Sequence, residues 1–348
     1  GKTSTFGITF YRDVTVPTTS IAVGEDNIAV YEFGKLITFG LYQNTPYVAN
    51  VTVTDPAGTE NASDNVSGIA SVSYRVVNLA QDVDPQLDYV AGETDTDDAL
   101  YEKVFDVVIK DAFKSVTLDK DGKFTVPVRI TDEDEIGNYV VFVRVEDNVG
   151  NAAIYGSNGM IFENVPATDV TINFDETSNN NKVNYKGADH FANGESVTLS
   201  ITANENSDLD VWSGIHKIDY TVTSESRDGI SYTAVPESGV FEQTPPDGVT
   251  LAELKENYSS LTGIISNIYT TQDQSQIVTV TASATDFAGN ESAQVSRTFV
   301  IDPVAPVISD TLTSGAQVQN GKYYNQDVVI TTEITERFLD MENKLIYT

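Results

Sequence analysis

Apolar and polar residues alternate with a period close to two through most of the chain. The pattern covers residues 51–54, 126–130, 139–145 and 277–281, which are rich in Val, Ile, Tyr and Phe. β-Branched and aromatic residues in such an alternation indicate half-buried antiparallel strands. Turn signals such as Lys-Asp-Gly-Lys at residues 120–123 separate the strands. Many short strands in this arrangement predict an all-β protein made of antiparallel β-sandwiches.

Three sequence marks recur in the same order along the chain. They are Ser-Gly-Ile at residues 67–69 and 213–215, Asp-x-x-Gly-Asn at residues 147–151 and 286–290, and a terminal strand that ends near Pro17, Pro166 or Pro306. The glycines of the first two marks lie 82 residues apart in the first copy and 75 residues apart in the second. Marks that keep similar separations predict tandem copies of one structural unit.

The marks divide the chain into four parts. We expect a first repeat over residues 15–165 and a second over residues 166–305, each large enough to bury a core. Residues 1–14 have the pattern of an N-terminal strand, or of the last strand of a preceding unit. Residues 306–348 begin a third repeat but lack its Ser-Gly-Ile and Asp-x-x-Gly-Asn marks. This incomplete repeat cannot close a sandwich core by itself.

Short helical insertions interrupt the strands in both repeats. Thr250 and Glu253 have the Thr-x-x-Glu spacing of a capping box, which predicts a helix over residues 251–258. The acidic residues 93–104 are compatible with one or two further helical turns. Both insertions lie between the Ser-Gly-Ile and Asp-x-x-Gly-Asn marks, so we expect them at a sheet edge or at one end of a sandwich.

Charge and composition exclude several classes of protein. The 348 residues carry a formal net charge of −32 and contain no cysteine. Such a charge repels phosphate backbones and anionic lipid, so we expect no nucleic-acid partner. No apolar stretch approaches the roughly 18 residues that a membrane helix needs, so we expect no membrane insertion. The absence of cysteine excludes disulfides and thiolate chemistry. We expect a monomer, and a section of a longer chain because the sequence opens and closes within strand-like segments.

The recurrent marks resemble the Ig-like repeats of large bacterial cell-surface proteins, especially Gram-positive ones. The second copy carries the resemblance through residues 212–215, 284–290 and 299–302, whereas the first departs from it at Val149, where alanine is usual. The resemblance implies tandem Ig-like sandwiches and a bacterial extracellular or cell-surface location. These marks are structural, so they specify architecture and leave the ligand open.

The Asp-x-x-Gly-Asn loops allow two interpretations. As plain turns, they use Asp to accept backbone N–H groups and Gly to supply a positive φ. Alternatively, they meet the acidic loop before Ser-Gly-Ile at one end of the sandwich and bind Ca²⁺, which takes six to eight oxygen ligands. The candidate ligands are Asp55, Asp64 and Asp147 in the first repeat, and Asp208, Asp210 and Asp286 in the second. Residues 117–122 only begin like an EF-hand loop, because Val128 occupies the position of the required bidentate Glu.

Other candidate chemistry is sparse. Trp212, the only tryptophan, is expected to pack at the end of the sandwich, and its alternative role is a stacking platform for a sugar; Tyr323 and Tyr324 allow the same alternative. The two histidines are His190 and His216, and the second lies inside a predicted strand next to Ser-Gly-Ile, which favours a structural role. The chain contains no Gly-x-Ser-x-Gly elbow and no His-Glu-x-x-His motif. We therefore expect no enzyme.

Three functions remain open at this point. The first is a non-catalytic stalk or adhesion module of a bacterial cell-surface or secreted multidomain protein, with an extracellular protein or glycan as ligand. The alternative is an accessory spacer or carbohydrate-binding module of a large extracellular carbohydrate-active enzyme. The third and weakest is a hydrolytic fragment, since 52 acidic residues make accidental carboxylate pairs unavoidable.

Overall fold

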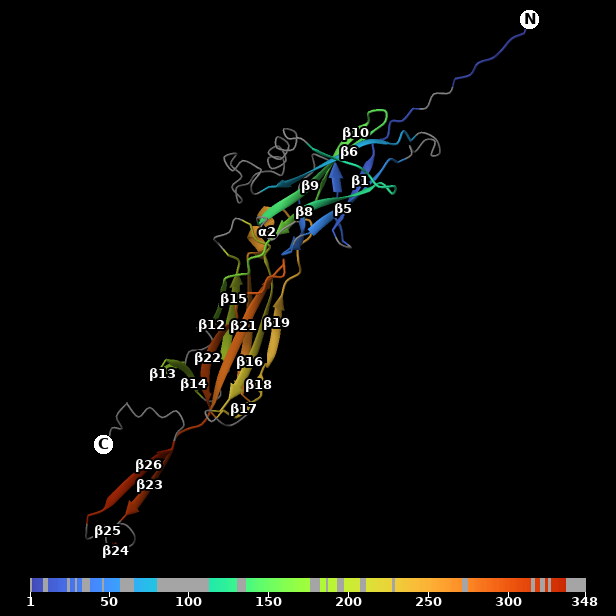
Figure 1. Cartoon of the computed structure of the whole chain (residues 1–348). Helices are drawn as coiled ribbons and strands as arrows, with labels where there is room; N and C mark the ends of the chain where they lie inside the picture. Colours follow the sequence, from blue (N-terminus) through green and yellow to red (C-terminus); the bar gives the residue numbers. More distant parts are fainter. Residues whose placement is uncertain are drawn as a thin grey trace.

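The computed structural model describes the chain over a set of segments. They are residues 2–8, 12–23, 26–28, 30–32, 38–45, 47–56, 66–79, 113–129, 136–175, 182–185, 187–192, 197–206, 211–226, 229–270, 275–313, 317–319, 323–324 and 327–335. Figure 1 shows two sandwiches arranged end to end, with a strand pair beyond the second. The first is called domain one and the second domain two. The expected insertion over residues 93–104 lies outside the described residues.

Domain one packs two sheets around an apolar core. One sheet has the strand order β2-β1-β5-β8, and the other is built around β9, with β6 on one side and β10 and β11 on the other. Val51, Val126 and Val143, none of them exposed, lie at the centre of the core between the sheets. The strands are β1 (Thr18–Val23), β2 (Asp26–Ile28), β3 (Val30–Glu32), β4 (Phe39–Gln43), β5 (Tyr47–Thr54), β6 (Ile69–Asn78), β7 (Lys114–Val116), β8 (Lys123–Arg129), β9 (Gly137–Asp147), β10 (Ala152–Ser157) and β11 (Gly159–Phe162).

Domain two has the same design. One sheet has the order β12-β15-β20-β18, and the other has the order β13-β14-β22-β21-β16-β17, with β19 also on β16. Three aromatic rings, Phe174, Phe191 and Phe299, pack together in its core. The strands are β12 (Asp169–Phe174), β13 (Val183–Tyr185), β14 (Ala188–Ala192), β15 (Val197–Asn204), β16 (Ile215–Glu225), β17 (Ser231–Tyr232), β18 (Ala234–Val235), β19 (Ser238–Glu242), β20 (Ser260–Thr270), β21 (Gln276–Asp286) and β22 (Val295–Asp302).

The registers of the two domains match. Ile69 pairs with Asp147 at the start of the β6–β9 ladder, and Ile215 pairs with Asp286 at the start of the β16–β21 ladder. The register shifts directly after this pair in both ladders. Each domain also contains a parallel strand pair, β4 with β11 and β14 with β22. The tandem repeats and the all-β sandwich fold predicted from the sequence are therefore confirmed.

The predicted helix is also confirmed. α2 spans Leu251–Tyr258 and begins at a capping box, in which Thr250 accepts from the backbone of Glu253 and the Glu253 side chain accepts from the backbone of Thr250. The two residues satisfy two backbone donors that a helix start leaves unpaired. Leu251 and Leu254 are buried on one side of this short helix.

The ends of the chain are less compact. The described residues before Thr18 form no strand, so the strand expected over residues 1–14 is not formed among them. After Pro306 come β23 (Val307–Thr313), β24 (Gln317–Gln319), β25 (Tyr323–Tyr324) and β26 (Val329–Thr335). The pair formed by β23 and β26 leaves Val307 61% and Ile330 62% exposed, as expected of an incomplete sandwich. Within the described residues, no helix has the length and apolarity needed to span a bilayer.

Candidate functional site

The joint between the two domains contains an apolar cluster drawn from both. β9 is covered on both faces: Val141 and Val143 point into the core of domain one, whereas Val140 and Phe142 point to the other face. That face is covered by a cluster of buried side chains, here called the joint cluster. Its domain-one members are Phe39, Val77, Leu79, Val140, Phe142 and Ile161, and its domain-two members are Val211, Leu251 and Leu254.

The joint cluster explains where α2 docks. Figure 1 places α2 between the two sandwiches, and its buried Leu side chains share the joint cluster with Val140 and Phe142 of β9. Burying one Leu side chain contributes about 1.5–3 kcal/mol. Leu251 and Leu254 are buried by residues of both domains, so part of this free energy depends on the contact with domain one. The helix insertion of domain two therefore packs against the neighbouring domain as well as its own.

Backbone hydrogen bonds cross the same joint. The N–H of Phe39 donates to the carbonyl of Val249 at 2.7 Å, and the N–H of Gly248 donates back to the carbonyl of Phe39 at 2.9 Å. The hydroxyl of Tyr42 donates to the carbonyl of Pro246 at 3.1 Å, and its ring lies 5.5 Å from that of Phe287. The segment before α2 thus pairs with β4 like a short strand, which fixes the two domains against sliding.

Glu163, in the linker between the domains, is bonded to both. Its N–H donates to the carbonyl of Gln43 in domain one at 3.0 Å. Its own carbonyl accepts from the Nδ2 of Asn290 in domain two at 3.0 Å, and its Oε2 accepts from the N–H of Ser213 at 2.5 Å. The linker is therefore held on both sides by a single residue.

Two further carboxyl groups surround the side chain of Glu163. Glu205 follows β15 and accepts the N–H of Gly214 through Oε1 at 2.8 Å, and Asp286 ends β21. One oxygen from each of Glu163, Glu205 and Asp286 lies within 4.8 Å of the others. All three residues are buried, with Glu163 and Asp286 at 0% and Glu205 at 6% exposure. These three groups are called the joint carboxylates.

The joint carboxylates repel one another when they are ionised. Burial, together with the charges of Glu205 and Asp286, raises the pKa of Glu163 well above its usual value. Burial and the charge of Asp286 likewise raise the pKa of Glu205. Burial raises the pKa of Asp286 as well, although hydrogen bonds from Asn290 act in the opposite direction. Three buried carboxyl groups at this separation require protons or a cation to balance their charge.

The Asp-x-x-Gly-Asn loops are turns of the expected kind. Oδ1 of Asp147 accepts the N–H groups of Val149 and Asn151, and Gly150 has a φ of 94°. In the second copy, Oδ1 of Asp286 accepts the N–H of Asn290 at 2.8 Å. In each copy, Oδ1 of the Asp accepts backbone N–H groups of the turn, and Oδ2 accepts from the Asn side chain.

Domain one repeats the network of the joint at its N-terminal end. Asp13 accepts the N–H of Ser67 at 2.6 Å, as Glu163 does from Ser213, and Asp55 accepts the N–H of Gly68 at 2.7 Å, as Glu205 does from Gly214. Asp147 corresponds to Asp286 by register. These three groups, Asp13, Asp55 and Asp147, are called the N-terminal carboxylates.

The N-terminal carboxylates are less buried than the joint carboxylates, and their electrostatics differ. Hydrogen bonds from the side chain and backbone of Thr15, and from Ser67, hold the pKa of Asp13 far below its usual value. Burial opposes ionisation of Asp147, but the bonds from Asn151 and Val149 outweigh it and lower its pKa. Burial, opposed by the N–H of Gly68, raises the pKa of Asp55. Two of these three groups therefore favour the ionised form.

The structure places three of the six predicted Ca²⁺ ligands in these networks. Asp55 and Asp147 belong to the N-terminal carboxylates, and Asp286 belongs to the joint carboxylates. Asp64, Asp208 and Asp210 lie outside the described residues. The sequence interpretation missed Asp13, Glu163 and Glu205. A signal for two of them exists, because Asp13 lies four residues before Pro17 and Glu163 lies three before Pro166.

The predicted ligand-binding aromatics lie in two places. Trp212 is half-buried and packs against the joint cluster, in line with the expected packing at the end of the sandwich. Tyr324 is half-buried on β25, opposite Gln317, and Tyr323 is the other residue of that strand. The three aromatics do not share one surface, because Trp212 lies at the joint between the domains, whereas β25 lies beyond the far end of domain two.

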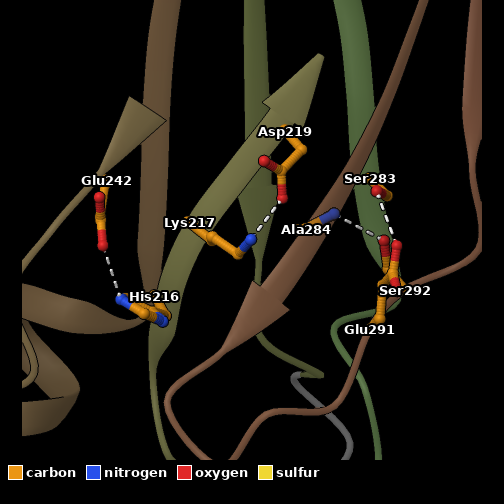
Figure 2. A network of polar contacts seen from close by, with 8 residues as sticks. All are labelled: His216, Lys217, Asp219, Glu242, Ser283, Ala284, Glu291 and Ser292. Carbon is orange, nitrogen blue, oxygen red and sulfur yellow. Dashed lines mark hydrogen bonds and ion pairs between the residues drawn. The ribbon is translucent and has the colours of Figure 1, made fainter. Parts of the chain in front are cut away.

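His216 lies in a group of polar contacts on domain two, shown in Figure 2. Its Nε2 lies 3.1 Å from Oε1 of Glu242, and its ring packs against Phe287 at 5.5 Å. Lys217 pairs separately with Asp219 at 2.8 Å, and the hydroxyl of Ser283 donates to Glu291 at 3.1 Å. Figure 2 shows these pairs side by side, with no hydroxyl next to the imidazole among the residues drawn. His190, the other histidine, lies on β14.

Comparison with known proteins gave only structural likenesses. A scan of family models and a search of curated proteins returned no match. Among solved structures, the chain is similar to the fibronectin(III)-like modules of Clostridium thermocellum CbhA, at 12% identity and a TM-score of 0.28, over 79% of this chain and 94% of that one.

Two adhesin structures are similar at the same level. A tetra-tandem repeat from the extending region of a large adhesion protein is 15% identical, with a TM-score of 0.28, over 92% of this chain and 64% of that one. A region of a 1.5-MDa bacterial ice-binding adhesin is 13% identical, with a TM-score of 0.29, over 83% of this chain and 69% of that one. The chain thus spans about two thirds of these adhesin structures. Likeness at this level concerns architecture alone, and the strand order of the chain itself identifies it as an all-β protein of tandem Ig-like sandwiches.

Proposed function

We propose that the chain is a stiff, non-catalytic spacer in an extracellular or cell-surface multidomain protein. The observation that carries the proposal is the joint, where apolar packing, backbone pairing and Glu163 act together on one interface. Domains joined by a bare linker are expected to move relative to one another, whereas a packed interface holds them in one orientation. Two sandwiches held in this way transmit position and force along their common axis.

Three further observations favour a spacer over a binding or catalytic module. Trp212 packs against the joint cluster, so its position has a structural explanation that does not require sugar binding. His216 and Ser283 each have a separate acidic partner. The net charge of −32 keeps an elongated protein from associating non-specifically. The likeness to adhesin repeats is compatible with this role, and adhesion itself stays a further proposal.

The proposal predicts a narrow distribution of distances between the domains. The chain has no cysteine, so spin labels can be attached at Thr125→Cys in domain one and Ser296→Cys in domain two, both at exposed strand positions. Double electron–electron resonance on the full chain, in chelator, is expected to give a single peak. Its width should match that of a control pair within domain two, Glu237→Cys with Ser296→Cys. A broad distribution between the domains, beside a narrow control, would contradict the proposal.

A further inference from the structure

The joint carboxylates have unused binding capacity. Oε1 of Glu163 and Oε2 of Glu205 are buried and have no hydrogen-bond partner, although both residues are more than nine-tenths buried. A carboxylate oxygen without a partner is costly to bury, because it gives up its water without replacement. The other oxygen of each side chain is used, by Ser213 and Gly214 respectively. The orientation of both groups is therefore fixed, with one oxygen left over.

The spacing of the carboxylates matches a single oxygen-binding cation. Ca²⁺ binds oxygen at about 2.3–2.6 Å, so two oxygens on one ion lie at most about 5 Å apart. One oxygen from each of the three side chains lies within 4.8 Å of the others. A ligand set of carboxylates alone favours a hard cation, whereas zinc sites draw on His and Cys.

We propose that Glu163, Glu205 and Asp286 bind one Ca²⁺ ion in the joint between the domains. The ion takes the free oxygens of Glu163 and Glu205 together with Asp286, and water completes its coordination. Because the backbone of Glu163 is bonded to Gln43 of domain one, the ion ties domain one to the loops of domain two.

The position of Trp212 provides a direct probe of this site. Trp212 precedes Ser213, whose N–H is bonded to Glu163. Tb³⁺, which takes oxygen ligands as Ca²⁺ does, is expected to luminesce when Trp212 is excited at the red edge of its absorption, where tyrosine does not absorb. Ca²⁺ should displace Tb³⁺ and quench the signal. Asp55→Asn, in the N-terminal carboxylates, should leave the Trp212-sensitised signal unchanged.

Thermal melts of the full chain test the ligands. Extracellular Ca²⁺ sites have a Kd of about 10⁻⁴–10⁻³ M, so about 5 mM Ca²⁺ should raise the Tm of domain two by about 2–9 °C over the value in chelator. Glu163→Gln keeps an acceptor for Ser213 and removes one of the three carboxyl groups. It should melt at or above wild type in chelator, yet gain less than a third of the rise in Ca²⁺. Glu205→Gln should behave in the same way.

The matched control is Glu242→Gln, the same substitution at an exposed position of domain two. It should keep the full Ca²⁺-induced rise. The proposal fails if wild type shows no rise and no Tb³⁺ signal, or if Glu163→Gln and Glu205→Gln rise as much as wild type. An equal rise with Mg²⁺ would overturn the choice of Ca²⁺. The melts do not depend on the distance between the domains, so they can fail while the spacer role stands, and the reverse.

Discussion

Leu254→Asp, a change in the helix of domain two, is expected to destabilise domain one. Leu254 is 1% exposed and belongs to the joint cluster, which covers the outer face of β9. Removing a buried Leu side chain costs about 2–5 kcal/mol, and burying a carboxylate in its place adds to that cost. Val140 and Phe142 of domain one then lose their cover.

Amide hydrogen exchange locates this effect. Amides of β6 and β9 in domain one should exchange about 30-fold faster or more in the variant, because local opening of the strands becomes easier. Ala252→Asp adds the same charge on the exposed side of α2 and should change exchange little. Equal exchange of β6 and β9 in the two variants would mean that α2 does not support domain one.

Phe299→Ala is expected to lower the free energy of unfolding of domain two by about 3–5 kcal/mol. Phe299 is fully buried, and its ring meets those of Phe174 and Phe191 edge-on, each at 5.6 Å between centroids. The substitution opens a cavity at the centre of this group and removes both edge-to-face contacts.

Urea unfolding followed by the fluorescence of Trp212 measures this change, because the only tryptophan lies in domain two. Phe6→Ala makes the same replacement at a side chain that is 85% exposed, so it should change stability by less than about 0.5 kcal/mol. A similar midpoint for the two variants would show that the three rings do not form the core.

The repetition of one sandwich along the chain was predictable because both copies carry the same two sequence marks, which meet in the fold. Ser-Gly-Ile opens a central strand and Asp-x-x-Gly-Asn ends its neighbour, and the N–H of Phe287 bonds the carbonyl of Gly214. The equivalent bond joins Asn148 to Gly68 in domain one. Turn chemistry and the period of two are local properties, so a sequence displays them directly.

The joint was harder to predict, although one signal was present. The period of two expected over residues 139–145 is wrong at its start, because residues 139–143 read Tyr-Val-Val-Phe-Val, a continuous apolar run, and all five are buried. Such a run is typical of a strand covered on both faces, which β9 is, whereas β21 alternates between buried and half-buried positions. The run indicates that something covers the second face, but it does not identify α2 as the cover. That contact joins residues more than 100 positions apart.

The ligand set of the joint could be predicted only in part. Asp286 stood out because its turn requires Asp, whereas Glu163 and Glu205 are single acids among 52 in the chain. They differ from the rest through burial and through the backbone N–H groups that orient them, which only the folded chain supplies. The position of Glu205 after β15 recurs as Asp55 after β5, and the position of Glu163 before Pro166 recurs as Asp13 before Pro17, so comparing repeats would have found them.

The central claim is that the two sandwiches move as one body. Residual dipolar couplings of backbone amides, measured for both domains of the full chain in one alignment medium, test it most directly. One alignment tensor, with the same magnitude and orientation in the frame of the structure, should fit the couplings of both domains. Two tensors of different magnitude would show independent motion, and would contradict the account of the joint as a rigid connection.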